Sequence, residues 1–474
     1  MAGWLGKAAS VVMVFIATWG ATILYWRSSG TVPTGMQMLA YLGLLPVGLS
    51  GAGFMLRGAA RRGVDAALDK AAADDDALPA EPAAGKAVPP SVALLGSAMN
   101  LGLGLPPTAL LALAAAPPRP SLDGRFRDTR NLPVRMSAAT DLQELDVLQV
   151  RQDGIDTAAH ERRAMALLQP VLDELLEAAG NALPPLEVAE EVVVAGLRRR
   201  DERPVGNVLT IELVVPAIWS DALRHWAQDW LLAQAGQAGL DARRFDVRVT
   251  TLDGPREAWG HASRLIDLLA DGGTARWHLL LACASCIDDA IVANWLASGE
   301  LATAQVPDGR VPGEGAAGVL LASPALGTDG AARLWRPQLL RADQVEATRP
   351  AEQRRQLAAL ATQWLAALPA DGAALQFVLH DADHRGDLMV DAAAITSALN
   401  PDLDFSPQSL ALAVSAGELG PVLPLAQLAL AQAQLHRQPG PVLLLGVADA
   451  QQRLFGLLDL LPSPTPAPDA SPAT

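Results

Sequence analysis

The sequence predicts an α/β protein in which helices cover the faces of a mixed sheet. Short runs of aliphatic and β-branched residues alternate with amphipathic stretches of helical period along most of the 474-residue chain. Half of the residues are hydrophobic and only 18% are charged, so the chain carries enough apolar side chain for a large core.

Two uncharged stretches stand at the N-terminus, over residues 8–26 and 36–56. Each is long enough to cross a bilayer as a helix, which takes about 20 residues. A secretory signal peptide is the alternative for the first stretch, but no small-x-small cleavage site follows it and a second span comes at once. We therefore expect a two-helix transmembrane hairpin over 1–62.

Basic residues close to the two spans predict the orientation of this hairpin. Lys7 precedes the first span, and Arg57, Arg61 and Arg62 follow the second, whereas Arg27 alone lies in the connecting loop. The positive-inside rule then predicts that both termini, and with them the globular part, are cytoplasmic, with the connecting loop outside.

Composition divides the rest of the chain into three parts. Residues 63–90 are rich in Ala, Asp and Pro and predict a flexible tether. Residues 91–461 predict the globular domain, and the proline-rich residues 462–474 predict a disordered tail.

Within the globular domain, strands and helices are expected to alternate. A buried strand, a loop and a helix are expected over 91–113. Further strands are expected over 207–216, 245–254, 276–285, 316–324, 374–383, 440–449 and 453–462. Helices are expected over 161–180, 219–239, 258–273, 352–368 and 423–437, with a helix or turn over 287–300.

Four segments, in this order, carry a resemblance to a known fold. They are "VALLGSAMNLGLG", "GEGAAGVLLASP", "SAGELGPVLPLAQLALAQAQ" and the closing "GPVLLLGVADAQQRLFGLLDL". Their order resembles the thiolase-like fold of the β-ketoacyl synthases, a five-layered αβαβα duplication. The resemblance predicts an α/β, thiolase-like layered domain behind the transmembrane hairpin.

Condensation in that family needs an activated thiolate at a helix N-terminus and two imidazoles. By register, the thiolate position falls at the head of the helix over 258–273, where the chain reads Gly260, His261, Ala262 and Ser263 and has no cysteine.

The imidazole positions are also altered. The resemblance places one imidazole in the turn that reads Gly417-Glu418-Leu419-Gly420. It places the other after a strand, where His380 and His384 stand in a different loop pattern. The resemblance therefore implies a pseudoenzyme with no catalytic, cofactor-binding or metal-binding residues.

Two further features have both a structural and a functional interpretation, and a third has a structural one. Cys283 and Cys286 form a CxxC that suits a redox or zinc site, or two apolar thiols at the end of a core strand. The segment "HDADHRGD" (380–387) suits a metal site or a solvated polar turn. Glu314 is expected to bond neighbouring amides in a structural turn.

The anchoring and the altered ketosynthase-like pattern resemble the lipase-adaptor family of type VI secretion. The resemblance implies a non-catalytic adaptor at a bacterial inner membrane, which recruits an effector, possibly a phospholipase, to a spike component. The resemblance to thiolase-like domains adds a homodimer as a further possibility. A net charge of −15 argues against a nucleic-acid partner. The alternatives are a divergent membrane-associated acyltransferase or condensing enzyme that uses Cys283 or Cys286, and a structural subunit of an envelope assembly.

Overall fold

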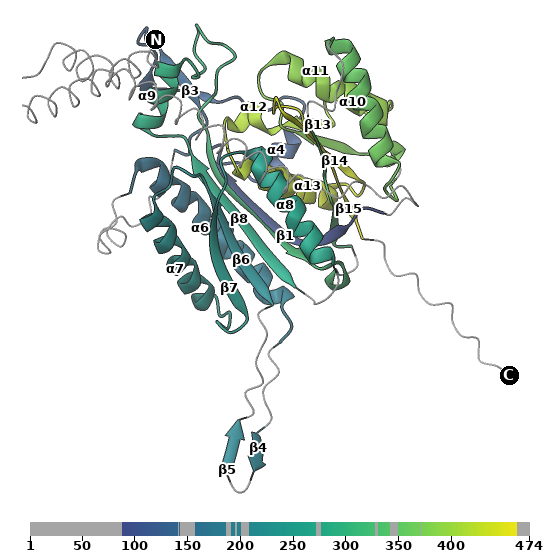
Figure 1. The fold of residues 1–474 in the computed structure, drawn as a ribbon. Coiled ribbons are helices and arrows are strands. Elements are labelled where there is room, and N and C mark those ends of the chain that lie inside the picture. The colour runs from purple at the N-terminus through teal and green to yellow at the C-terminus, as the bar shows by residue number, and fades with distance from the viewer. Residues whose placement is uncertain are drawn as a thin grey trace, which may run out of the picture. The chain divides into compact units, whose positions relative to one another are not determined.

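A computed structural model describes residues 88–140, 142, 157–185, 191–194, 197–200, 208–271, 276–327, 330–341, 349–370 and 372–461 (Figure 1). The predicted transmembrane hairpin, most of the tether and the C-terminal tail lie outside these residues. Within the described ranges, no helix combines the length and the apolar character that a membrane crossing needs.

The first half of the globular domain is a βαβαβαββ unit. It consists of β1 (Ser91–Leu101), α6 (Ala159–Ala182), β6 (Leu209–Val215), α7 (Asp221–Gln237), β7 (Phe245–Thr251), α8 (Pro255–Ala270), β8 (Trp277–Ser285) and β9 (Glu314–Ala322). The strands lie in the order β7-β6-β8-β9-β1. β6 is parallel to both β7 and β8, whereas β9 is antiparallel to both β8 and β1.

The second half repeats this unit. It consists of β10 (Ala332–Trp335), α10 (Pro350–Leu365), β12 (Phe377–His380), α11 (Gly386–Leu399), β13 (Ser409–Ala411), α13 (Val422–Arg437), β14 (Val442–Gly446) and β15 (Gln452–Leu460). The strand order is β13-β12-β14-β15-β10 with the same directions as in the first half. β1 pairs with β10, which joins the two halves into one sheet.

The remaining described α-helices and strands are additions to the two repeated units. They are α4 (Pro107–Ala112), β2 (Ser121–Arg127), β3 (Pro133–Met136), β4 (Glu191–Val194), β5 (Leu197–Arg200), α9 (Asp289–Ser298), β11 (Gln338–Arg341) and α12 (Leu412–Ala416). α9 and the β2–β3 hairpin share a small apolar cluster built around Met136 and Trp295.

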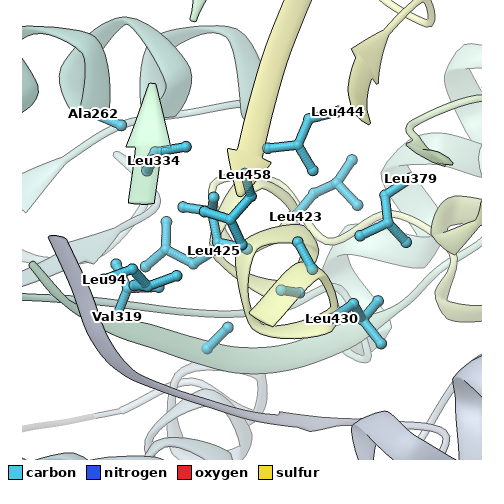
Figure 2. Packing of buried hydrophobic residues seen from close by; sticks show 14 of the residues in the cluster. Leu94, Ala262, Val319, Leu334, Leu379, Leu423, Leu425, Leu430, Leu444 and Leu458 are labelled. Carbon is cyan, nitrogen blue, oxygen red and sulfur yellow. The ribbon is translucent and has the colours of Figure 1, made fainter. Parts of the chain in front are cut away.

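The helices form three layers with the two halves of the sheet between them. α8 and α13 lie in the middle layer, and α13 is buried along nearly its whole length. Figure 2 shows side chains from both halves, such as Val319 and Leu444, around this helix. α6 and α7 cover the outer face of the first half, and α10 and α11 cover that of the second. The predicted five-layered αβαβα arrangement is confirmed.

Alternation along each strand decides which layer a side chain enters. On β8, Leu280 and Ala282 face the middle layer, whereas Leu281 and Cys283 face α6 and α7. The fully buried β8 and β9 read as continuous apolar runs because helices cover both of their faces.

Glu314 forms buried hydrogen bonds and an ion pair that link several segments of the first half. Its carboxylate is fully buried and forms a bidentate pair with Arg163 of α6, at 2.6 and 2.7 Å. It also accepts hydrogen bonds from the backbone N–H of Ala139 at 2.7 Å and the hydroxyl of Ser285 at 2.9 Å. The predicted structural role of this turn is therefore correct.

Two details of the predicted elements are wrong. α8 begins at Pro255, three residues before the expected start, because Gly254 caps it and a proline fits the first helical turn. The segment 380–387 was expected to be strand, turn and loop, but α11 begins at Gly386.

Candidate functional site

A cavity of about 330 Å³ lies at the carboxyl ends of β12 and β14. Five segments line it. They are the first turn of α8, residues 308–311 before β9, residues 381–385 after β12, residues from 413 to 423 around the start of α13, and residues from 446 to 454 of the β14–β15 hairpin. Ligands of open α/β sheets bind in the crevice outside the carboxyl ends of the strands, which makes this cavity the candidate site.

The three positions that the resemblance singled out meet at this cavity. Pro255 and Trp259 line it from the head of α8, Gly417 and Glu418 from the turn before α13, and His384 from the loop after β12. The prediction that Gly260–Ser263 stand at the head of the helix is wrong, because these residues lie in the second turn of α8, and Ser263 is buried. No cysteine lines the cavity.

His261 has a structural partner instead of a catalytic one. Its Nε2 lies 3.0 Å from the buried carboxylate of Glu212 on β6, which also bonds Nε2 of His278 at 2.9 Å and Arg248 at 2.9 Å. Burial opposes ionisation of Glu212, but the contacts with both imidazoles hold its pKa well below the usual range. Burial lowers the pKa of His278. This network fastens α8 to three strands.

The turn before α13 holds a paired carboxylate. Gly417 and Gly420 have positive φ angles of 68° and 52°, which favours glycine at both positions. Oε2 of Glu418 lies 3.4 Å from Nε of Arg310, and Oε1 accepts a hydrogen bond from the backbone N–H of Gly420 at 3.3 Å. The expected imidazole is therefore replaced by an ion pair on the cavity wall.

His380 faces away from the cavity. Phe377 and Leu379 of β12 enter the middle layer, so Val378 and His380 enter the outer layer with α10 and α11. The buried imidazole stacks on Phe405 with centroids 5.5 Å apart, and neither nitrogen bonds a described residue. Burial lowers the pKa of His380 to about 4.

His384 remains as the imidazole of the cavity. It is held by a hydrogen bond between its Nε2 and the carbonyl oxygen of Pro307 at 2.8 Å. Because a carbonyl only accepts, Nε2 carries the proton and Nδ1 is the acceptor of the neutral ring.

The two cysteines are not arranged for catalysis. Cys283 is fully buried against α6 and α7, and burial raises the pKa of its thiol. The thiol of Cys286 lies behind the cavity wall, 3.9 Å from the carbonyl oxygen of Glu418, and burial raises its pKa to about 12. A nucleophilic thiol needs a lowered pKa, so the displaced-cysteine site finds no support in this geometry.

The sequence indicated Asp381 only as one member of the segment 380–387, and it did not indicate Arg453. Oδ1 of Asp381 accepts hydrogen bonds from the backbone N–H groups of Val447 at 2.6 Å and Ala448 at 3.0 Å. Its Oδ2 has no partner among the described residues. Burial raises the pKa of Asp381 to about 6, against the opposing effect of these amides.

Arg453 lies beside Asp381 on the cavity wall and is only 9% exposed. Its Nη1 donates to the carbonyl oxygens of Asp449 and Gln452. Its Nη2 has no hydrogen bond or ion pair with any described residue. The Nε of Arg453 is buried and likewise has no hydrogen bond with a described residue. Asp381 and Arg453, which both line the cavity, thus leave one carboxyl oxygen and the Nη2 nitrogen available to a ligand.

The interpretation of 380–387 as a solvated turn is wrong for its first two residues, since His380 is fully buried and Asp381 is only 9% exposed. The interpretation of this segment as a metal site is not supported either. Across the part of the chain that the structure covers, no three His, Cys, Asp or Glu side chains are grouped so that they could hold a metal ion.

Comparison with known proteins gives a fold but no family. No protein-family model matches the chain, and no curated protein matches its sequence. Among solved structures, it is similar to ChlB3, which is named as an acyltransferase, at 13% identity and a TM-score of 0.44, over 79% of this chain and 99% of that one.

Two further solved structures are similar to the same extent. One is the oxazolomycin ketosynthase domain from OzmH of Streptomyces albus, at 13% identity and a TM-score of 0.44, over 78% of this chain and 95% of that one. The other is cerulenin-bound OleA of Xanthomonas campestris, at 12% identity and a TM-score of 0.41, over 78% and 97%.

The described domain has a thiolase-like fold. The duplicated, five-layered topology supports this statement, and TM-scores below 0.5 transfer neither a reaction nor a substrate from those proteins. The predictions of a non-catalytic type VI secretion adaptor and of a pseudoenzyme are corrected here, because the solved structures that resemble this chain are condensing enzymes and acyltransferases.

Proposed function

We propose that this chain is an acyl-transfer enzyme of thiolase-like fold that uses a carboxyl group in place of the missing thiol. In this proposal Asp381 is the general base and Arg453 stabilises the developing oxyanion. The observation that carries it is the presence of both free groups, Oδ2 of Asp381 and Nη2 of Arg453, in one cavity between the head of α8 and the turn before α13.

The protonation state of Asp381 suits this role. A general base works best when its pKa lies near the operating pH. Burial raises the pKa of Asp381 to about 6, so the group is mostly ionised near neutrality and still basic enough to accept a proton. The two backbone N–H groups on Oδ1 fix the carboxyl plane and leave Oδ2 as the basic atom.

The proposed step is attack of water or an alcohol on an acyl thioester. Oδ2 takes the proton of the nucleophile, whose oxygen forms a bond to the carbonyl carbon while the C=O electron pair moves onto oxygen. Nη2 of Arg453 donates to that oxyanion. Collapse of the intermediate breaks the C–S bond, and the departing thiolate receives the proton from Asp381.

Apolar and small residues complete the site. Trp259, Leu423 and Leu454 line the cavity and suit a short acyl chain. A Cβ on Gly446 would lie 2.8 Å from the Cβ of Leu454 and 3.5 Å from Oδ2 of Asp381, so glycine at this position keeps the base accessible.

The test is thiol release from butyryl-CoA by the full chain. Asp381→Asn keeps an oxygen for the two backbone amides but removes the base, and we expect the rate to fall by about 10²-fold or more. Cys286→Ser is the matched control and should keep the rate. Loss of activity in Cys286→Ser, with activity retained in Asp381→Asn, would refute the proposal in favour of a thiol enzyme.

A further inference from the structure

One cation of the cavity has no hydrogen-bonded carboxylate partner among the described residues. Arg453 is more than nine-tenths buried, and the hydrogen bonds of its guanidinium to described residues go to two carbonyl oxygens. Burying a charge without a counter-charge is unfavourable. The ionised form of Asp381 lies close enough to interact with Arg453, but no hydrogen bond joins the two side chains.

The other charged groups that face Asp381 have partners. Asp383 pairs with Arg385 at 2.7 Å, and Glu418 with Arg310 at 3.4 Å. Asp449 accepts from the N–H groups of Gln451 and Gln452 within its own turn. Among the remaining lining residues, Arg256 bonds the amide of Gln451 and lies 3.5 Å from Glu257, and His384 bonds Pro307. Asp308 interacts electrostatically with Arg385.

We propose that this cavity binds a short aliphatic carboxylate together with one proton. One oxygen of the carboxylate accepts from Nη2 of Arg453, and the other accepts from Oδ2–H of protonated Asp381. The inference rests on the proposed function, because a free carboxylate is the product of acyl transfer to water.

The balance of charge in the cavity explains why a proton must accompany the carboxylate ligand. If Asp381 stayed ionised, two carboxylates would face one guanidinium, which is unfavourable in a buried site. With Asp381 protonated, the ligand and Arg453 neutralise each other, and every polar atom of the ligand has a donor. The same pair of residues therefore catalyses when Asp381 is ionised and retains the product when it is protonated.

The direction of the pKa shift favours this coupling. Asp381 binds its proton at about pH 6 in the absence of ligand. Above that pH each ligand must bring a proton from solution, so the affinity falls by about tenfold for each pH unit. The enzyme is thus inhibited by its product in mildly acidic solution and released from it as the pH rises.

Calorimetric titration of the full chain with butyrate tests the inference. Runs at pH 5.5, 6.5 and 7.5, each in two buffers of different ionisation enthalpy, count the protons taken up. We expect one proton per butyrate at pH 7.5, and an affinity about tenfold weaker there than at pH 6.5. An affinity that does not change with pH, or the absence of any butyrate binding, would overturn the inference.

Two variants and a control identify the groups. Asp381→Asn should bind butyrate without pH dependence, because the amide donates at every pH. Arg453→Gln should lose at least tenfold in affinity. Arg125→Gln removes an exposed arginine of β2 that pairs with Asp123 and should match the wild type. Inorganic phosphate serves as a competing anion, and binding of phosphate more tightly than butyrate would rule out the carboxylate class.

The two proposals fail in different ways. Turnover of butyryl-CoA without proton-linked butyrate binding would refute the product-retention mechanism and leave the acyl-transfer function standing. Proton-linked butyrate binding without turnover would refute the acyl-transfer function, and the cavity would then be a carboxylate-binding site only.

Discussion

His380 and Asp381 are neighbours in the chain, but their side chains lie on opposite sides of the sheet. The imidazole of His380 stacks on Phe405 in the outer layer, whereas the carboxyl of Asp381 bonds the amides of Val447 and Ala448 and lines the cavity. One strand end therefore supplies a buried neutral base to the core and a titratable acid to the site.

Replacement of His380 should stabilise the protein. A neutral imidazole has one N–H donor, and in this site it has no acceptor among the described residues, which costs about 1 to 3 kcal/mol. His380→Phe keeps an aromatic ring beside Phe405 and removes the donor. We expect the free energy of unfolding at pH 7 to rise by about 1 kcal/mol in urea titrations. A fall in stability would mean that the imidazole has a partner.

The two neighbours should have opposite effects on the pH dependence of stability. Burial lowers the pKa of His380 from its ordinary value of 6.5 to about 4 in the folded state, so the unfolded chain binds the proton first and stability falls as the pH drops through this window. The pKa of Asp381 is about 6 against 3.8, so the folded chain binds the proton first and stability rises as the pH drops from about 6.

Unfolding free energies at several pH values between 7 and 4 would separate these effects. The advantage of His380→Phe over the wild type should grow as the pH falls, because the variant no longer loses stability to protonation of the unfolded imidazole. Asp381→Asn should show the reverse trend and lose stability relative to the wild type as the pH falls. Parallel curves for all three proteins would contradict both assignments.

Removal of the buried carboxylate on β9 should be strongly destabilising. Glu314→Ala leaves the buried guanidinium of Arg163 without its partner, which costs about 3 to 5 kcal/mol. Glu300→Gln removes one partner of Arg310 from a pair whose side chains are both more than 40% exposed, and we expect less than about 1 kcal/mol. Equal effects of the two substitutions in thermal or urea unfolding would show that Glu314 has no special role.

A methyl group on the β14–β15 hairpin should impair both folding and turnover. In Gly446→Ala the new Cβ would lie 2.8 Å from the Cβ of Leu454, which cannot move without its backbone, and 3.5 Å from Oδ2 of Asp381. We expect thiol release from butyryl-CoA to slow by about tenfold or more, since small displacements of a catalytic group are costly. Gly386→Ala is the control, because a Cβ there meets nothing within 4 Å. Full activity of Gly446→Ala would exclude Asp381 as the base.

The alternation of strands and helices could be predicted from the sequence because buried strands and amphipathic helices have distinct periods. The five-layered arrangement was implied by the resemblance that four ordered segments carry. The start of α8 could also have been predicted, since Gly254-Pro255 is a typical helix beginning and moves the helix head into the cavity. The β2–β3 hairpin was missed because β2 is mostly exposed and carries several charges, whereas β3 alternates but has only four residues.

The candidate site was harder to predict because it depends on contacts between distant segments. Asp381 looked like a solvated turn residue, and only the fold buries it against Val447 and Ala448. An arginine at the start of the otherwise apolar stretch 453–458 was a usable signal for Arg453. The opposite orientations of Leu379 and His380 follow from strand alternation, but only after the layers on either side are known.

The cavity is lined by residues from both repeats of the βαβαβαββ unit. The first repeat contributes the head of α8 and residues 308–311, while the second contributes Asp381, Arg453 and the turn before α13. Neither half could hold the reactive pair and its opposite wall alone. A chain divided between β9 and β10 should therefore gain activity only by fragment complementation, and mixing two inactive halves would measure the assembly of the site directly.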